Sequence, residues 1–317
     1  MAIASNSKNR SVGQESVVVK WAHEDVISGE RLQAIAEVTV LTASILAFHR
    51  SLRQSGVRDI ALFPGTHTEL KPDAASIALL RDRRSIFVYS HLLPSFIDRV
   101  LPHLNHRFVL ISHNSDDRVD DRFMSALDDQ RLEHWYAQNA MVNHPKLTPL
   151  PIGIANAQWP HGRIDDLIAV AKSAPAARRD IVYCNFDIST NPAVRAPLMK
   201  RLAASTLTWQ APVRSFRDYL GDMAQCRWCI SPPGNGIDCH RTWEALYLGV
   251  VPIVQRTPWG AFLHDGLPII QAEDIGALRR GALEKDQKTL ETREHDLARL
   301  TMRYWRKRIF NKVAQTA

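Results

Sequence analysis

The sequence predicts an α/β protein built from parallel sheets in two domains, and three observations lead to this fold class. Short apolar runs of strand character alternate with segments of helical spacing, as in parallel strands connected by helices. The chain has 317 residues, more than one hydrophobic core comfortably serves. A stretch near residue 155 is rich in Pro and Gly and has the composition of a hinge. We therefore expect a first domain over residues 17–155 and a second over residues 156–298.

The composition is that of an ordinary globular protein, with 45% hydrophobic residues and a mean hydropathy of −0.21. The sequence contains no apolar run of membrane-spanning length. The polar start, Met1–Ser16, lacks the apolar core of a secretory signal, so we expect it to be disordered and the protein to be cytoplasmic. The net charge of +7 suits an anionic ligand such as a nucleotide, an acidic glycan or a phospholipid surface. No nucleic-acid-binding motif accompanies this charge.

Four cysteines, Cys184, Cys226, Cys229 and Cys239, lie in apolar contexts without a framework of paired spacings. Cys226 and Cys229 form a Cys-x-x-Cys pair, but a zinc site needs a second pair of ligands and this pair lies along an expected strand. We expect buried structural cysteines in a reducing compartment.

The first domain is expected to begin with a helix over Ala34–Leu52 and to continue with three short buried strands. The strands are Asp59–Phe63, Ser85–Ser90 and Arg107–Ser112, with a helix over Pro94–Leu101 between the last two. Each strand is followed by a histidine within a few residues, and the carboxyl ends of parallel strands meet at one edge of a sheet. This edge is therefore the expected ligand site of the domain.

Candidates for a general base lie at these strand ends. His67, His91 and His113 each have a neutral form near physiological pH, and Asp116 and Asp117 follow His113. We rank His113 and Asp116 first and His91 after them. For any single one of these residues, a loop side chain that makes only local hydrogen bonds is an open alternative.

The same region offers metal-ligand types without a metal-site spacing. His113, Asp116, Asp117 and Asp120 match no motif of known geometry, and the chain has no Asp-x-Asp triplet. We expect neither a metal nor a cofactor.

The hinge is expected after the Pro-rich extended segment Leu147–Ile154. Asn156, Trp159 and His161 follow it and are candidates for the lining of a cleft between the domains, although Trp159 could equally fill the hinge.

The second domain repeats the alternation of strands and helices. The expected helices are Ile164–Ala174, Pro192–Leu202, Ser215–Met223, Asp274–Glu284 and Gln287–Lys312, and the expected strands include Asp180–Phe186, Leu207–Gln210 and Leu267–Ile270. Thr190, Asn191 and Arg195 place a hydroxyl, an amide and a guanidinium at the start of one helix, which suits an anion. An ordinary helix cap with a surface arginine is the alternative.

One stretch of this domain carries most of the chemistry. The strand Cys226–Ser231 leads into a loop of Pro and Gly residues, then into a helix with Asp238 as the expected N-cap and Gly249 as its stop, and then into the strand Val250–Val254. Such a loop lies at the carboxyl end of a parallel sheet, where the N–H groups of the following helix favour an anion. The expected anion-binding residues of this stretch are Pro233, Gly234, Asn235, Gly236, Asp238 and His240.

Two side chains on the helix sharpen this expectation. Arg241 lies in the first turn, where a guanidinium can contact phosphate oxygens, and Glu244 lies one turn further on, where a carboxylate can accept two ribose hydroxyls. The alternative is a surface ion pair at i,i+3 spacing. The loop is neither a Walker loop nor a G-x-G-x-x-G loop.

The segment PPGNGIDCHRTWEALYLGVVPIV resembles the signature of exostosin-like and ribitol xylosyltransferase-like glycosyltransferases. Glu244-Ala245, Gly249 and Pro252-Ile253-Val254 are similar to the E-A-x-x-x-G-x-P-V-V segment of many glycosyltransferases of the GT-B type. The P-I-G-I-A-N and W-P-H-G motifs of the hinge look like the exostosin-like pattern, and Ser189–Arg195 resembles the phosphate-contacting first loop of GT-B donor domains.

This resemblance implies a GT-B fold, in which two Rossmann-like doubly wound domains face a central cleft, with residues 299–317 as a basic helix that crosses back to the first domain. It implies an inverting, metal-independent transfer of a sugar from a nucleotide-diphosphate sugar to a glycan or another hydroxyl acceptor. Arg195 and Arg241 would hold phosphate, Glu244 the ribose, and His113 or Asp116 would be the base.

Other functions remain open at this point. A non-catalytic nucleotide- or polyanion-binding protein would have the same architecture. A glycoside hydrolase would need paired carboxylates, for which the sequence offers no convincing candidates. The basic C-terminal helix is expected to be a solvated face with an apolar stripe, with contact to a membrane surface as the alternative. The sequence identifies neither the sugar nor the oligomeric state.

Overall fold

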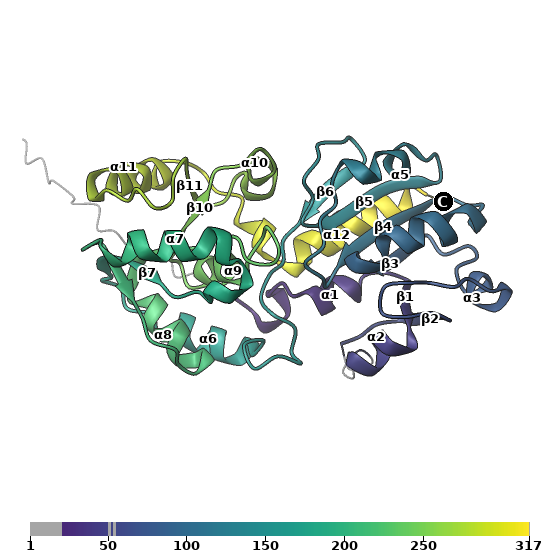
Figure 1. The fold of residues 1–317 in the computed structure, drawn as a ribbon, viewed down its shortest axis with the longest axis horizontal. Helices are drawn as coiled ribbons and strands as arrows, with labels where there is room; N and C mark the ends of the chain where they lie inside the picture. The colour runs from purple at the N-terminus through teal and green to yellow at the C-terminus, as the bar shows by residue number, and fades with distance from the viewer. Residues whose placement is uncertain (1–20, 50–51, 53–54, 317) are drawn as a thin grey trace, which may run out of the picture.

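The computed structural model describes residues 21–49, 52 and 55–316. The expectation for Met1–Ser16 lies outside these residues. Two parallel sheets, each flanked by helices, form two lobes that lie side by side (Figure 1).

The first sheet has six parallel strands in the order β2-β1-β3-β4-β5-β6. Its strands are β1 (Val38–Thr42), β2 (Asp59–Phe63), β3 (Ser85–Tyr89), β4 (Phe108–His113), β5 (Leu132–Gln138) and β6 (Leu147–Leu150). The helices of this lobe are α1 (Gly29–Gln33), α2 (Ala43–Phe48), α3 (Ala74–Ala78), α4 (Leu93–Ser95) and α5 (Met124–Asp128). The Pro-rich strand β6 lies at an edge of the sheet, where a missing N–H is tolerated.

The second sheet has five parallel strands in the order β11-β10-β9-β7-β8. Its strands are β7 (Arg179–Cys184), β8 (Thr208–Gln210), β9 (Cys226–Ile230), β10 (Val251–Gln255) and β11 (Ile270–Ala272). The helices that follow the hinge are α6 (Ile164–Ser173), α7 (Pro192–Ala203), α8 (Phe216–Ala224), α9 (His240–Tyr247), α10 (Pro258–His264), α11 (Arg280–Glu291) and α12 (Met302–Ala314).

Both sheets reverse their strand order at one point, between β1 and β3 in the first and between β7 and β9 in the second. A parallel sheet with such a reversal is doubly wound, and ligands bind where the loops diverge at that reversal. The expected fold class, two Rossmann-like α/β domains, is therefore confirmed by the strand order. The reversals also show where each domain should carry its site.

The helix expected over Ala34–Leu52 is wrong in its first half, because Val38–Thr42 forms the strand β1. All five residues of β1 are buried, since the strand lies between β2 and β3 and is covered on both faces. A strand buried on both faces shows no alternation of apolar and polar residues, so its apolar positions also fit a helical spacing. Only Ala43–Phe48 is helical, as α2.

The two helices expected after residue 273 are displaced. Helix α11 covers Arg280–Glu291, and the chain then leaves the helix and starts again at Met302 as α12. The restart has a local cause, because the Thr301 hydroxyl accepts a hydrogen bond from the Tyr304 N–H at 3.2 Å and caps α12. Helix α10 was not expected from the sequence.

Helix α12 packs on the first sheet although it comes last in the chain. Met302, Trp305, Ile309 and Val313 belong to the same core as the strands β1–β5, and in Figure 1 the helix lies beside β4 and β5. Its other face is exposed and carries Arg303, Arg306, Lys307 and Arg308. The expected apolar stripe with a solvated basic face is what the burial of this helix shows.

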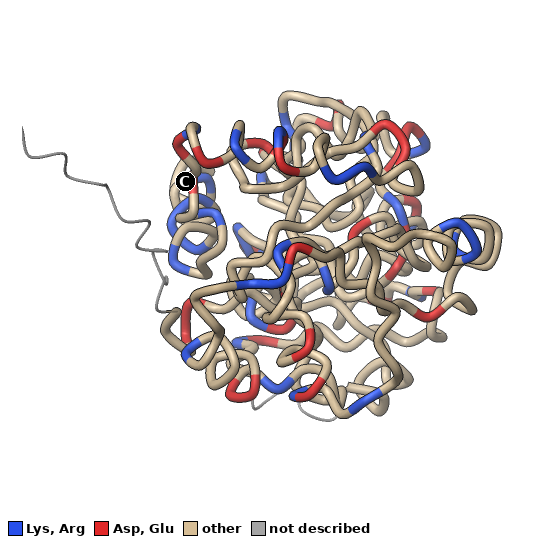
Figure 2. Tube along the Cα trace, turned by 90° about the vertical axis from the view of Figure 1, so that its left-hand side faces the viewer, with Lys and Arg blue, Asp and Glu red and all other residues tan. Residues whose placement is uncertain are grey.

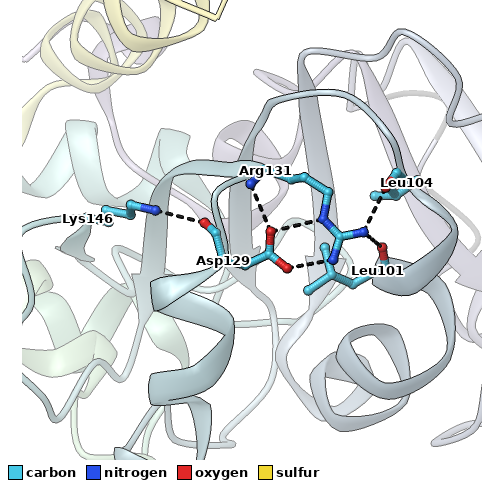
Figure 3. A network of polar contacts seen from close by, with 5 residues as sticks. All are labelled: Leu101, Leu104, Asp129, Arg131 and Lys146. Carbon is cyan, nitrogen blue, oxygen red and sulfur yellow. Dashed lines mark hydrogen bonds and ion pairs between the residues drawn. The ribbon is translucent and has the colours of Figure 1, made fainter.

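Figure 2 shows Lys and Arg interspersed with Asp and Glu along the chain. At the amino edge of the first sheet, such charges form a local network (Figure 3). The Arg131 guanidinium binds the Asp129 carboxylate and donates to the carbonyl oxygens of Leu101 and Leu104 at 2.8 Å each, while Lys146 Nζ donates to the Asp129 carbonyl at 2.8 Å. The network ties the loop before β5 to the loops before β4 and β6, at the edge opposite the carboxyl ends of the strands.

Candidate functional site

Two adjoining cavities lie at the carboxyl ends of the two sheets. The larger one, about 540 Å³, is lined by loops after β7 and β9, at the strand reversal of the second sheet, and we call it the second-sheet cavity. The other, about 470 Å³, is lined by loops after β2, β3 and β4 and by the hinge, and we call it the first-sheet cavity. The residues that line both cavities are Asp116, Ile152, His161, Asn235 and His240. The two cavities are therefore parts of one cleft between the sheets.

The second-sheet cavity brings together most of the residues expected to bind an anion. Those that line it are Thr190, Arg195, Gly234, Asn235, Gly236, Asp238, His240, Arg241 and Glu244. Two expected residues lie behind this lining and support the loop instead. Asn191 Nδ2 donates to the Gly234 carbonyl at 3.1 Å, and the Pro233 carbonyl accepts from Arg195.

Arg195 supports the loop rather than presenting a free guanidinium. Its side chain is buried, with 4% of the residue exposed, and all five of its N–H donors have acceptors. The acceptors are the carbonyl oxygens of Pro233 (2.9 Å), Asp187 (2.7 Å) and Pro232 (3.0 Å), the Thr190 hydroxyl and the Cys239 sulfur (3.6 Å). The expectation that Arg195 contacts phosphate is therefore replaced by a structural role, in which it shapes the Pro232–Gly236 loop.

Arg241 differs from Arg195 because one of its guanidinium nitrogens has no hydrogen-bond acceptor among the described residues. Its Nε donates to the Asn185 carbonyl at 2.8 Å, while its Nη1 is buried and has no hydrogen-bond partner within the described part of the chain. The residue lines the second-sheet cavity and comes from the first turn of α9. A cationic side chain whose buried N–H donor has no acceptor is costly unless an anion accepts that hydrogen bond. Arg241 therefore indicates an anionic ligand.

Glu244 lies one turn along the same helix and is also buried, with 3% exposed. Its Oε2 accepts a hydrogen bond from the Tyr219 hydroxyl at 2.8 Å. Burial raises the pKa of Glu244 to about 7, although the Tyr219 hydrogen bond and the charge of Arg241 oppose this shift. The ion pairs of the described residues do not include one between Arg241 and Glu244. The alternative of an exposed surface pair is thus contradicted by the burial of Glu244.

Asp238 is not the N-cap of α9, which is a correction to the sequence expectation. The cap position belongs to Cys239, and the buried Asp238 carboxylate accepts from the Ile152 N–H and Trp243 Nε1 at 2.8 Å each. Burial raises its pKa to about 6, against these hydrogen bonds. Because Ile152 belongs to the hinge, Asp238 fastens the loop to the hinge.

Further contacts fix this loop against the first sheet. His240 Nδ1 lies 2.8 Å from the Gly153 carbonyl, and the Asp238 N–H donates to Asn139 Oδ1 at 3.2 Å. Asn139 follows β5 with a positive φ of 53° and donates from Nδ2 to the Asp116 carbonyl at 3.2 Å. One amide side chain therefore connects the loop of the second sheet to the loop that carries Asp116.

His113 cannot serve as an available base in this arrangement. Only 1% of the residue is exposed, and both ring nitrogens are engaged. Nε2 lies 3.0 Å from the Pro151 carbonyl, and Nδ1 accepts from the Asn114 N–H at 2.8 Å and lies 3.1 Å from Asn114 Oδ1. The backbone carbonyl and backbone N–H partners favour the neutral Nε2–H tautomer. Burial lowers the pKa of His113 to about 4. The first-ranked histidine is thus a structural residue that holds the hinge against β4.

His91 retains an unused ring nitrogen. Its Nε2 is buried and has no partner among the residues that the structure describes, and its ring stacks on His67 with a centroid distance of 4.5 Å. Burial lowers the pKa of His91 to about 4, with a further lowering by His67. The ring is therefore neutral at physiological pH and can accept a hydrogen bond from a ligand in the first-sheet cavity.

Asp116 lies where the two cavities meet, and its side chain is open to both. Desolvation by partial burial raises the pKa of its carboxyl, a hydrogen bond with the Asn235 side chain opposes the shift, and the charge of Asp117 adds to it. A carboxylate of raised pKa at the junction of two ligand cavities is well placed to take a proton. Of the three expected bases, Asp116 has the geometry best suited to that role.

The hinge residues lie as expected along the cleft. Trp159 is 42% exposed and lines the first-sheet cavity, so it does not fill the hinge. His161 lines both cavities. Asn156 accepts from the Glu30 N–H at 2.9 Å and donates to Asn114 Oδ1 at 3.2 Å, which ties the hinge to the start of the first domain.

Several residues of the site gave no signal in the sequence. Gly29 is one, because a Cβ there would lie 1.8 Å from Asn114 Oδ1, so only glycine permits α1 to approach the end of β4. The others are Asn139, Asn185, Tyr219 and Phe48. Each reaches the site through packing between distant segments, which spacing along the chain does not report.

Three of the four cysteines belong to the core. Cys184, Cys226 and Cys229 are buried as expected, while Cys239 is partly exposed and lines the second-sheet cavity. Over residues 21–49, 52 and 55–316, no group of three or more His, Cys, Asp or Glu residues is placed to hold a metal ion. The helices of the same residues include none with the length and apolarity needed to cross a membrane.

No protein-family model and no curated protein matches the chain. Among solved structures, the glycotransferase of kitacinnamycin is 13% identical over 91% of this chain and 92% of its own, with a TM-score of 0.39. The spinosyn rhamnosyltransferase complexed with thymidine diphosphate is 13% identical over 88% and 96%, with a TM-score of 0.37. An α1,3-fucosyltransferase with GDP is 10% identical over 91% and 96%, with a TM-score of 0.38. With TM-scores below 0.5 these likenesses are too loose to assign an activity, and the fold class rests on the strand order of this chain.

Proposed function

We propose that this protein is a glycosyltransferase of the GT-B type that moves a sugar from a nucleotide-diphosphate sugar to a hydroxyl group of an acceptor. The observation that carries the proposal is the junction of the two cavities. A carboxylate, Asp116, lies between a cavity that contains the incompletely paired Arg241 and a cavity that contains neutral histidines. Such a cleft holds a donor on one side and an acceptor on the other.

The second-sheet cavity would bind the donor nucleotide. The backbone N–H groups of His240 and Arg241, at the start of α9, and Arg241 Nη1 would contact the diphosphate, since the described residues offer these donors no acceptor. Glu244 would accept hydrogen bonds from the ribose hydroxyls through its carboxylate, with Tyr219 holding Oε2 in place. Arg195 would act indirectly, because it keeps the loop in the shape that faces the diphosphate.

The reaction would be a direct displacement. The acceptor oxygen forms a bond to the anomeric carbon while the bond from that carbon to the diphosphate oxygen breaks, and the electron pair leaves with the nucleoside diphosphate. Asp116 takes the proton of the acceptor hydroxyl. Arg241 and the start of α9 stabilise the negative charge of the leaving group without requiring a metal. Attack from the face opposite the leaving group inverts the anomeric configuration.

The resemblance to exostosin-like and ribitol xylosyltransferase-like enzymes supports this assignment over residues 232–254. Within that segment, the two side chains of the motif, Arg241 and Glu244, are the ones that point to a nucleotide. The sugar, which could be a hexose or a pentose, is left to experiment.

A nucleotide screen followed by a transfer assay tests the proposal. The wild-type protein should be stabilised in a thermal shift assay by one class among UDP, GDP, CMP and dTDP sugars, and it should transfer the matching sugar. Arg241→Gln should lower kcat about 10²- to 10³-fold, as loss of a donor to developing charge does, and Glu244→Gln should raise the KM for the donor. Arg201→Gln is the control, because Arg201 forms an exposed pair with Asp274 in the same domain.

Near-normal turnover in Arg241→Gln would refute the assigned diphosphate site. Nucleotide binding without hydrolysis or transfer would support the alternative of a non-catalytic nucleotide-binding protein instead. If no nucleotide raises the melting temperature, the result would favour a polyanion as the ligand of Arg241.

A further inference from the structure

The first-sheet cavity has an aromatic wall made of two runs of rings that meet at Phe48. In one run, Phe48 contacts Trp159 (ring centroids 6.0 Å apart), which is stacked on His161 at 6.3 Å. His161 in turn lies 6.2 Å from His240, beside the second-sheet cavity.

The other run follows the ends of the first-sheet strands. It leads from Phe48 through His49 and Tyr89 to His91 and His67, with centroid distances between 4.5 and 5.7 Å. Apart from the buried Tyr89, every ring of the two runs lines the cavity.

The rings of Phe48 and Trp159 are exposed, whereas four other tryptophans are buried. Phe48 is 56% and Trp159 is 42% exposed, whereas Trp135, Trp228, Trp243 and Trp305 are each at most 2% exposed. Both exposed rings line the cavity, so their apolar faces meet water where a ligand would lie. Burying them under the apolar face of a ligand ring would be favourable.

The described lining of the cavity is almost without charge. Among the lining residues that the structure describes, Asp116 alone is an Asp, Glu, Lys or Arg. Burial lowers the pKa values of His49, His91, His161 and His240, so these rings are neutral at physiological pH. Within this described lining, an anionic acceptor would meet a carboxylate and no cation, although the whole chain carries a net charge of +7.

Polar groups lie between the ring faces and suit hydroxyls. His91 Nε2 is buried and unpaired within the described segments, and Ser115, Gln138 and Asn156 also line the cavity. Flat apolar faces with neutral hydrogen-bonding groups at their edges match the surface of a saccharide, whose C–H faces are apolar and whose O–H groups lie at the rim.

We infer that the first-sheet cavity binds an uncharged saccharide, with one sugar ring packed on Trp159 and Phe48 and a hydroxyl directed toward His91 and Asp116. The inference rests on the proposed glycosyltransferase function and names its acceptor class. It excludes uronic acids and phosphorylated sugars as preferred acceptors, and it makes Trp159 and Phe48 residues that determine specificity.

Saturation-transfer NMR and calorimetry on the full-length protein test the inference with matched probes. The probes are methyl glucoside, methyl galactoside and their methyl uronides, which differ from the neutral sugars only at C6, and 4-methylphenol as an aromatic compound without a sugar. Each is measured with and without saturating UDP, GDP, CMP and dTDP. At least one neutral glycoside should bind, and its uronide should bind about tenfold or more weakly.

Variants locate the binding. Trp159→Ala should weaken binding of the neutral glycoside about tenfold and Phe48→Ala somewhat less, as expected for loss of one stacked ring. Phe262→Ala is the matched control, because Phe262 is 48% exposed on α10 and lines neither cavity of the cleft. Nucleotide-induced thermal shifts should be equal in all four proteins, which shows that the variants are folded.

Three results would overturn the inference: uronides that bind as tightly as their neutral partners, equal binding by wild type and Trp159→Ala, or 4-methylphenol binding as tightly as a glycoside. If nucleotides bind and no neutral glycoside does, the acceptor assignment fails while the proposed donor site stands. If glycosides bind and no nucleotide does, the saccharide site stands and the proposed transferase function fails.

Discussion

The two cavities of the cleft have the same topological origin and opposite chemistry. Each lies at the carboxyl ends of a doubly wound sheet, next to the point where the strand order reverses. The second-sheet cavity is lined by Arg195, Arg214 and Arg241, whereas the described residues that line the first-sheet cavity include no arginine or lysine. The fold thus determines where a ligand binds, and the loops determine which charge it carries.

The cavities also differ in how their walls are held. In the second sheet, the Arg195 guanidinium binds three backbone carbonyls, and hydrogen bonds of Asn191 and Asp238 also hold the loop, so its shape depends on directed polar contacts. In the first sheet, neutral rings contact one another and no single residue fixes the wall. The loss of one residue should therefore affect the two cavities differently.

The largest effect is expected at the point where the cavities meet. Asp116→Asn should lower kcat for transfer about 10²- to 10⁴-fold, because the amide cannot take the acceptor proton. Binding of the donor nucleotide should change little, since Asp116 lies at the edge of the second-sheet cavity. Steady-state kinetics and nucleotide calorimetry measure the two quantities separately.

Asp117→Asn is the matched control, because Asp117 is an exposed neighbour that lines neither cavity. Equal losses in both variants would indicate a general disturbance of the loop. An unchanged kcat in Asp116→Asn would show that Asp116 is not the base, and His91 in the first-sheet cavity would then be the candidate.

A second effect separates a buried arginine, Arg195, from an exposed arginine of the same domain, Arg201. Arg195→Lys should lower the free energy of unfolding by about 3 to 5 kcal/mol, since several buried carbonyl groups lose their donor. Arg201→Lys, which alters an exposed pair, should cost less than about 1 kcal/mol. Urea denaturation measures both. If Arg195→Lys kept its stability and lost nucleotide binding, Arg195 would be a ligand contact after all.

The smallest effect is a pH dependence on the acceptor side. The pKa of His113 is about 4 in the folded protein because of burial, against roughly 6.5 for an unperturbed histidine. The neutral ring stabilises the fold above the unfolded pKa, and this contribution, about 3 kcal/mol, is lost as the pH falls from about 6.5 through 4.

Urea denaturation between pH 7.5 and 4.5 measures this loss, and the imidazole ¹⁵N resonances of His113 should report the Nε2–H tautomer throughout the upper part of the range. A His113 resonance that titrates near the unperturbed histidine value of about 6.5 would show that the ring is not held between Pro151 and Asn114.

The sequence was sufficient for elements whose limits have a local cause. β2 and β3 are bounded by turn residues, and α9 ends where Gly249 has a positive φ of 68°. β1 was misread because burial on both faces removes the alternation that identifies a strand. α10 is short, with only seven residues, and gave too few turns for a periodic signal.

The residues of the site also differ in whether their positions depend on local sequence or on distant contacts. Arg241 and Glu244 could be foreseen because both lie in one helix turn after one loop. For His113 the position at a strand end was right, but the carbonyl that occupies its Nε2 comes from Pro151, 38 residues further on. Tyr219 and Phe48 enter the cleft from helices whose packing is decided by the whole fold, so no spacing rule could assign them.

The position of α12 has a consequence for how the chain is made. Since Met302, Trp305, Ile309 and Val313 belong to the core of the first sheet, that core needs residues that follow the strands of both sheets in the sequence. During synthesis, the first sheet therefore lacks these apolar contacts until after the second sheet, whose strand β11 ends at Ala272, has its strands. Although its strands come first in the sequence, the core of the first sheet is completed after the strands of the second sheet.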